Sequence, residues 1–232
     1  MHDLWHLQRQ EFFANLEPQK QRFLAHAQRR EYKKNGIVFF EGERGDSCFY
    51  LKSGLVRIFS ISESGKEPVF FLRRPGEMFG LSEVLNDYPR KTNAQAITPA
   101  EIYSMNGSEF DKVLAGDYAL ARRVITVLGS RLRQLSENIS DLVSCSVMER
   151  LIKLLIALGY EQLPDAGAWN SPVRIALRIS QGQIAAMIGS TQPTVSDLLQ
   201  ELQEDDLVSV SNRQITLRDP SGLLAKAARL KT

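Results

Sequence analysis

Two adjacent cations, Arg90 and Lys91, follow an apolar turn at residues 79–82. A guanidinium or ammonium group attracts the phosphate or carboxylate of a small molecule, and the glycine at position 80 lets a backbone approach a ligand closely. These residue types predict a site for an anionic or partly apolar small molecule. The alternative is that both cations pair with acidic side chains at the surface.

A second group of polar residues lies in the segment 180–206, where two short helical patterns flank a glycine. Ser180 and Thr191 are good N-caps for the two helices, and Pro193 suits the first turn of the second one. Two helices joined by a short turn with glycine form the helix-turn-helix of DNA-binding proteins. Residues 207–217 then predict a small hairpin, the wing. Because such helix pairs also occur in other helical proteins, the pattern alone does not establish DNA binding.

The cysteine and histidine inventory excludes several chemistries. The two cysteines, Cys48 and Cys145, are too far apart in sequence for a CxxC metal pair, and His2, His6 and His26 all lie near the start. Iron–sulfur clusters held by four cysteines and zinc sites with Cys/His spacing are therefore excluded. A metal enzyme on a β-roll needs a His/Glu set, and no histidine follows His26, so we expect no enzymatic activity.

Composition points to an ordinary globular chain. We find no apolar run of about 18 residues and no apolar core of a signal peptide at the start, so we expect a cytoplasmic protein without a membrane contact. The 29 basic and 27 acidic side chains give a formal net charge of +2. This balance argues against nucleic-acid binding through bulk charge, although a local basic patch is compatible with it.

The sequence pattern changes once within the first half of the chain. Residues 3–34 have apolar positions near helical spacing and predict short helices, one with Pro18 in its first turn. From Gly36 to about Tyr103, glycines separate short β-rich runs at 37–40, 48–51, 55–59 and 68–72. Short strands with regular turn residues predict a sandwich or barrel. We interpret the glycines as turn residues that need positive φ.

A long helix is predicted between Asp117 and about Val143. Leu, Val or Ile recurs every three or four residues, at Leu120, Val124, Leu128, Leu132, Leu135, Ile139 and Leu142. A helix of this length is roughly 40 Å long, more than one small domain covers. We therefore predict that a second copy packs on this stripe and that the protein is a homodimer. The alternative is that the stripe packs only against its own chain.

The order of these pieces resembles the Crp/Fnr superfamily of bacterial transcription regulators over nearly the whole chain. The resemblance depends on the glycine-punctuated β-region, on residues 75–80 followed by Pro89-Arg90, on residues 147–151 and on positions within 184–199. It implies an α+β fold with an effector-sensing N-terminal double-stranded β-helix (a cupin-like β-roll), a long dimerisation helix and a C-terminal winged helix-turn-helix. We place these parts at residues 1–116, 117–144 and 145–232.

The resemblance implies a homodimeric regulator that binds a palindromic operator in double-stranded DNA and contacts RNA polymerase. Many members of the family are activators, so we favour activation. Two alternatives remain: a ligand-sensing module without ordinary DNA binding, and a haem-based gas sensor. Haem needs an axial ligand, and no His, Cys or Met lies at a position that we recognise as a family ligand.

The effector site departs from the cyclic-AMP-binding members. Leu81 stands where those members have Glu, Lys91 replaces a small hydroxyl residue, and Leu135-Ser136 align with a Thr-Ser pair that reads adenine. Losing the acceptor for a buried hydroxyl costs about 1–3 kcal/mol, so cyclic AMP is disfavoured and the effector is another small molecule. The candidate effector-binding residues are Phe79, Gly80, Leu81, Ser82, Arg90, Lys91, Thr92, Leu135 and Ser136.

The DNA reader departs as well. Residues 180–206 contain no Lys or Arg but five acids, and Gln192 and Asp197 stand where well-known members have arginines that read guanine. Gln reads adenine and Asp accepts from cytosine N4, so we expect an unusual target sequence. Positive charge must come from Arg174, Arg178, Arg213 and Arg218, which predicts a shallow salt dependence. The candidate DNA-binding residues are Ser180, Gln181, Thr191, Gln192, Thr194, Ser196, Asp197 and Arg213.

Overall fold

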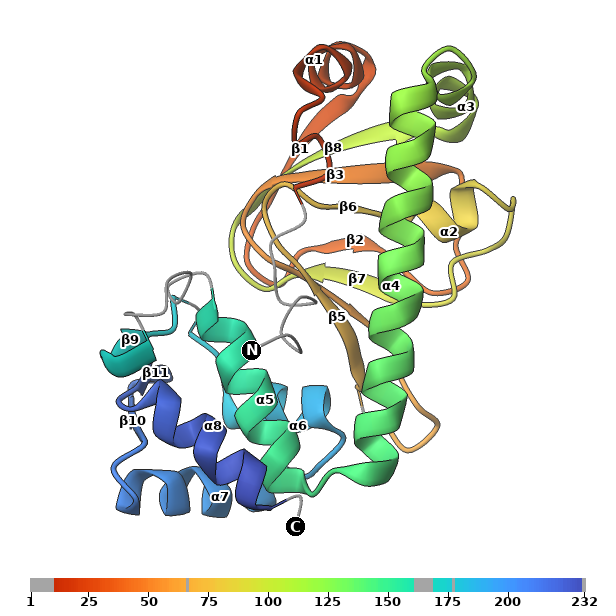
Figure 1. Cartoon of the computed structure of the whole chain (residues 1–232). Helices are drawn as coiled ribbons and strands as arrows, with labels where there is room; N and C mark the ends of the chain where they lie inside the picture. Colours follow the sequence, from red (N-terminus) through yellow and green to blue (C-terminus); the bar gives the residue numbers. More distant parts are fainter. Residues whose placement is uncertain (1–10, 66, 161–168, 177, 231–232) are drawn as a thin grey trace. The chain divides into compact units, whose positions relative to one another are not determined.

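The computed structural model describes residues 11–65, 67–160, 169–176 and 178–230, drawn with their helices and strands in Figure 1. The chain divides into two compact units, the first ending at Arg131 and the second continuing from Leu132. This division falls inside the long helix α4 (Tyr118–Ser144). The first half of α4 therefore belongs to one unit and its second half to the other.

The first unit is a β-roll of two antiparallel sheets, with strand orders β1-β8-β3-β6 and β2-β7-β4-β5. Its strands are β1 (Gln28–Tyr32), β2 (Ile37–Phe39), β3 (Ser47–Ser53), β4 (Val56–Phe59), β5 (Val69–Arg73), β6 (Met78–Phe79), β7 (Asn93–Ala96) and β8 (Ala100–Asn106). The helices α1 (Glu17–His26), α2 (Leu81–Val84) and α3 (Gly107–Ala115) accompany them. The predicted β-roll is confirmed.

Two clusters of buried side chains hold this unit together. One lies under the helices and joins Phe23 of α1, Phe110 of α3 and Leu120 of α4 to Tyr50 and Met105 of the sheet. The other fills the inside of the roll with aromatic and small residues: Phe39, Phe49, Leu51, Val56, Ile58, Phe79, Ala94, Ala96, Ala100 and Ile102. Burying each large apolar side chain contributes about 1.5–3 kcal/mol.

The expectation of helices over residues 3–34 holds only for α1, which has Pro18 in its first turn as predicted. The part before residue 11 lies outside the described residues. Phe12 and Phe13 lie in a turn, and Gln28–Tyr32 is strand β1, paired antiparallel with β8. Polar residues are common on such an edge strand because one of its sides has no neighbour. Helical spacing was therefore the wrong criterion for this stretch.

The second unit, beyond the end of α4, is built around three strands in the order β10-β11-β9. Its elements are α5 (Val147–Gly159), β9 (Val173–Arg174), α6 (Gln181–Ile188), α7 (Gln192–Glu204), β10 (Val208–Ser211), β11 (Gln214–Leu217) and α8 (Pro220–Arg229). The turn between β10 and β11 has positive φ at Asn212 and Arg213, as a tight two-residue hairpin requires. The predicted wing is confirmed.

No helix among the described residues is long and apolar enough to cross a lipid bilayer.

Candidate functional site

The helix-turn-helix is set by its caps. The Ser180 hydroxyl accepts a hydrogen bond from the Gln183 backbone N–H at 3.2 Å, and the Gln183 side chain accepts from the Ser180 backbone N–H at 2.9 Å. Gly189 ends α6 with φ of 63°, a left-handed conformation that other residues rarely adopt. Thr191 then caps α7, whose first turn contains Pro193. These local signals are the ones from which the sequence predicts the motif.

The inner face of the two helices forms the core of the reader. Ile184 and Ile188 of α6 and Val195 and Leu199 of α7 are buried. Leu198, which the pattern places inward, is only half-buried. The apolar face therefore fixes which side chains α7 presents outward.

The candidate DNA-binding residues lie at three places on this unit. Thr191, Gln192 and Asp197 are exposed at the start of α7, and Arg213 is exposed at the tip of the wing. Three candidates are committed to local contacts, since Ser180 caps α6 and the Thr191 and Thr194 hydroxyls lie 2.8 Å apart. Gln181, Thr194 and Ser196 are half-buried. The exposed side-chain amide of Gln192 and carboxylate of Asp197 are therefore available to contact base edges.

A hollow of about 310 Å³ lies beside the wing. Its lining combines two arginines with polar side chains: Arg174, Arg178, Ser209, Ser211, Asn212, Gln214 and Thr216. Arg174 and Arg178 are exposed, and no ion pair is recorded for either within the described part of the chain. Guanidinium groups with neighbouring hydroxyls and amides form the kind of surface that holds a phosphate oxygen.

Three of the five acids in residues 180–206 form ion pairs with cations of the same unit. Lys226 of α8 contacts Glu201 and Asp205, each at 2.7 Å, and Arg218 forms an ion pair with Asp206. All three acids lie in the second half of α7 or just after it, away from its N-terminal end. Arg218, one of the four predicted flanking cations, is therefore already paired, whereas Asp197 near the start of α7 stays exposed.

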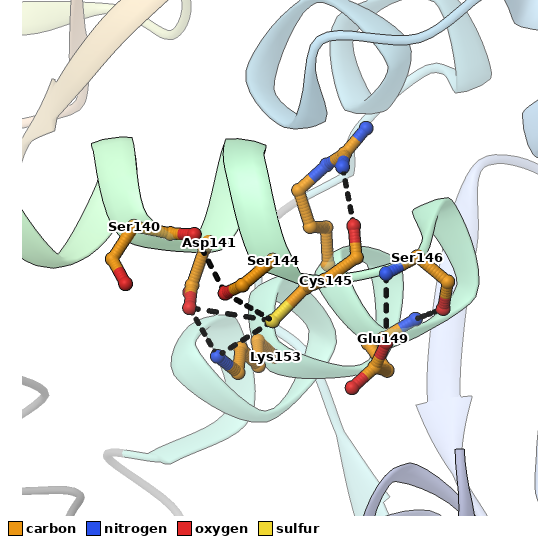
Figure 2. Close-up of polar contacts among 8 residues, drawn as sticks. Ser140, Asp141, Ser144, Cys145, Ser146, Glu149 and Lys153 are labelled. Carbon is orange, nitrogen blue, oxygen red and sulfur yellow. Dashed lines mark hydrogen bonds and ion pairs between the residues drawn. The ribbon is translucent and has the colours of Figure 1, made fainter. Parts of the chain in front are cut away.

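The connection between α4 and α5 is a compact polar joint (Figure 2). Asp141 of α4 forms an ion pair with Lys153 of α5, and Cys145 Sγ lies 3.5 Å from both groups. The Arg150 guanidinium donates to the carbonyl of Cys145 at 2.7 Å and to the carbonyl of Ile188 at 2.9 Å. Arg150 thus ties the end of α4 to the end of α6, a link that sequence patterns alone do not indicate.

In the roll, the predicted effector turn is centred on Gly80 and Arg90. Gly80 has φ of 70°, and a Cβ there would lie 2.9 Å from the Arg90 guanidinium. Arg90 is only 2% exposed, and its Nη1 lies 3.2 Å from both the Gly80 carbonyl and Glu83 Oε2. Its other terminal nitrogen donates to the Ser47 carbonyl. Burial lowers the pKa of Arg90, opposed by the nearby Glu83 carboxylate.

Two aromatic rings lie close to that arginine inside the roll, and a third stacks on one of them. The Arg90 guanidinium carbon lies 4.4 Å from the centre of the Phe39 ring and 5.4 Å from that of Phe49. Phe49 and Phe79 are stacked with their ring centres 5.0 Å apart. Arg90 therefore pairs with an acid, Glu83, as the alternative predicts. The pair lies in the interior rather than at the surface.

These contacts leave no uncompensated positive charge at Arg90. The positive charge of Arg90 is already balanced by Glu83, and that carboxylate would repel a phosphate placed beside the guanidinium. Leu81 offers no acceptor for a ribose hydroxyl and is buried.

The remaining effector candidates are scattered. Phe79 is buried in the roll, Ser82 and Lys91 are exposed and Thr92 is half-buried. Leu135 and Ser136 belong to the part of α4 that lies in the second unit, where both are exposed. Within the first unit, the structure brings together Phe79, Gly80 and Arg90, and it adds Glu83, which the sequence does not single out.

The predicted apolar stripe of α4 divides into two parts. Leu120 and Val124 are 0% and 4% exposed and belong to the core of the first unit, with Leu128 packed against it. Leu120 and Val124 are therefore core residues rather than dimer-interface residues. Leu132, Leu135, Ile139 and Leu142 are 68%, 36%, 61% and 55% exposed. Packing against its own chain thus accounts for the first part of the stripe only.

Comparison with known proteins assigns both halves of the chain. Residues 29–117 match the cyclic nucleotide-binding domain, and residues 149–226 match the Crp-like helix-turn-helix domain. The CRP-like cAMP-activated global transcriptional regulator of Mycobacterium tuberculosis is 27% identical over 197 residues, which cover 85% of this chain and 87% of the relative. The global nitrogen regulator of Nostoc sp. is 29% identical over 192 residues, covering 82% and 84%.

A solved structure shows the same fold. The c-di-GMP responsive global regulator CLP of Xanthomonas campestris superposes with a TM-score of 0.74 at 22% identity, over 87% of this chain and 99% of that one. One relative is named a transcriptional regulator and the other a global nitrogen regulator, and the two matched domains are a cyclic nucleotide-binding domain and a helix-turn-helix domain. This chain belongs to the Crp/Fnr superfamily of DNA-binding transcription regulators.

Proposed function

We propose that the chain is a homodimeric, effector-responsive transcription regulator that acts in the cytoplasm on a palindromic operator. The observation that carries the proposal is the surface of the second unit. There the exposed start of α7 lies in one unit with a wing flanked by Arg174 and Arg178, and Glu201, Asp205 and Asp206 are paired with Lys226 and Arg218. In such DNA-binding domains, a helix in the major groove recognises the bases, and cations that contact the adjacent phosphates position the protein.

The proposed roles differ among these residues. Gln192 and Asp197 read base edges, while Arg174, Arg178 and Arg213 neutralise phosphates. With three cations per subunit and no cation on α7, affinity depends less on salt than in readers with basic recognition helices. The effector is an anionic or partly apolar small molecule other than cyclic AMP. By analogy with the many activators of the family, the regulator activates transcription through contact with RNA polymerase.

Selection from random DNA duplexes followed by mobility shift tests this function. We expect one enriched palindrome bound by two copies of the chain. Changing Gln192→Ala should cost about 1–3 kcal/mol and relax specificity at one base pair per half-site. Failure to enrich any sequence, with or without a cell extract of metabolites, would favour the ligand-sensing module without DNA binding. A Soret absorption band in the purified protein would favour the haem sensor.

The phosphate contacts have a separate readout. Arg174→Gln and Arg178→Gln should each weaken binding to every DNA sequence and reduce the slope of log affinity against log salt by about one. Arg218→Gln is the matched control, since it removes an arginine that Asp206 already neutralises. Equal slopes for Arg178→Gln and Arg218→Gln would contradict the assignment of the hollow to DNA.

A further inference from the structure

Two arginines in the first unit occupy positions where the pattern of the fold calls for apolar residues. Arg73 follows Val69 and Phe71 at alternate positions of β5 and is paired with the fully buried Val56 of β4, so it continues the inward face of the strand. It is 7% exposed. Arg131 of α4 follows Val124 and Val127 at helical spacing, on the side of the helix that packs against the roll.

These two cations share a single carboxylate. Arg73 Nη1 donates to Glu77 Oε2 at 3.2 Å, and the Arg73 guanidinium carbon lies 4.6 Å from the centre of the Phe71 ring. Arg131 donates to the carbonyl of Met78, the residue that follows Glu77. The buried Nε of Arg73 has no hydrogen-bond partner among the described residues. The cluster therefore carries one excess positive charge and one unused donor.

The energetic cost of this arrangement appears as a lowered pKa in both arginines. Burial lowers the pKa of Arg73. Burial, together with the positive charge of Arg73, lowers the pKa of Arg131 to about 9. A buried charge without an equal counter-charge is unfavourable, and large destabilising features of this kind commonly mark functional sites. Arg90 differs in charge, because Glu83 balances it and its terminal nitrogens are used, although its Nε is likewise buried without a hydrogen-bond partner among the described residues.

We propose that Arg73 and Arg131 bind the carboxylate or phosphate group of the effector, so that the anion supplies the missing negative charge beside Glu77. This proposal rests on the proposed function for its link to regulation but not for the site itself. Because Arg131 lies on α4, the occupied site exerts its effect on the helix that continues into the second unit. Arg90 keeps a structural role in this scheme.

Thermal unfolding and titration calorimetry of the full-length protein test the site, with citrate and inorganic phosphate as probes at constant ionic strength. In the wild type, one or both anions should bind and raise the Tm. Arg73→Met and Arg131→Met should weaken that binding by at least about tenfold, since each removes a charged donor. Arg131→Met should also raise the Tm of the anion-free protein because the excess charge is gone, whereas Arg73→Met leaves Glu77 without its ion-pair partner and should lower it. Arg122→Met, at an exposed position of α4, is the control and should bind as the wild type does.

Glu77→Gln gives the sharpest distinction. If Glu77 competes with an anion for the two arginines, its neutralisation should tighten anion binding several-fold. If Arg73, Arg131 and Glu77 instead form a purely structural cluster that binds no anion, Glu77→Gln should only lower the Tm. Weaker or unchanged anion binding in Glu77→Gln, wild-type binding in Arg131→Met, or no binding of either anion to the wild type would each overturn the proposal. A preference for citrate or for phosphate tells a carboxylate effector from a phosphate effector.

A DNA-binding measurement in the same samples separates the two proposals. Anions that bind the wild type and change its affinity for the selected palindrome support both. Anion binding without any change in DNA affinity leaves the site standing and refutes its regulatory role. Excluded salts raise the Tm of all variants alike, so the comparison with Arg122→Met removes that general effect.

Discussion

At the scale of single residues, the structure changes the meaning of Arg90. The sequence identifies this arginine by its residue type and by its position after the glycine turn, and the structure keeps it beside that turn. Its partner Glu83 is not predictable, because the pairing depends on how α2 packs beside β3 rather than on spacing. Arg73 does leave a signal in the sequence, since it follows Val69 and Phe71 at alternate positions, whereas Arg131 lies beside the regular apolar stripe of α4 and leaves none.

Arg90→Met tests the structural role of this arginine. The substitution leaves the Glu83 carboxylate, whose side chain is 15% exposed, without its counter-charge. We expect a loss of about 3–5 kcal/mol in the free energy of unfolding, measured with urea. Arg29→Met removes an exposed arginine paired with Glu31 and Glu101, and it should cost less than about 1 kcal/mol. A stable Arg90→Met with a lost effector response would instead return Arg90 to the effector site.

At the scale of elements, predictions succeeded where local chemistry determines the structure. The helix-turn-helix and the wing follow from caps, a left-handed glycine and a tight turn, all of which act within a few residues. Strand β1 was missed because its identity depends on β8, far along the chain. Strand β9 likewise depends on pairing far along the chain, since it consists of Val173 and Arg174 paired with β11. Sequence periodicity therefore does not predict elements that depend on long-range strand pairing.

Gly189→Ala tests the turn of the helix-turn-helix. An alanine would have to keep φ near 63°, and its Cβ would lie 3.1 Å from a methyl carbon of Leu142. We expect a loss of about 1–2 kcal/mol in stability and weaker DNA binding, because the angle between α6 and α7 must change. Gly182→Ala in the first turn of α6 is the matched control, with its nearest contact at 3.5 Å. Equal unfolding free energies for the two variants would show that the left-handed turn is not required.

At the scale of the whole molecule, the long helix is the element that both units share. Its first part is buried in the core of the first unit, while its second part presents Leu132, Ile139 and Leu142 to solvent in the single chain. The joint at Asp141, Cys145 and Lys153 fixes the point at which α4 passes into α5, and Arg150 extends that link to α6. A displacement of α4 at Arg131 therefore has a continuous path of bonded elements to the reader, which is the physical requirement for coupling.

The exposed part of the stripe supplies the last prediction. Three large apolar side chains more than half exposed on one helix call for a partner, and a second copy is the simplest one. Leu132→Asp and Ile139→Asp should each yield monomers in analytical sedimentation, because each would place a charge in the apolar interface between the copies. Asn138→Asp adds the same charge at another exposed position of α4 and should leave the dimer intact. Leu120→Ala should instead lower the free energy of unfolding by about 2–5 kcal/mol, since Leu120 is fully buried within its own chain. A dimer that persists in both aspartate variants would exclude this part of α4 as the interface, and the palindromic operator would then need another explanation.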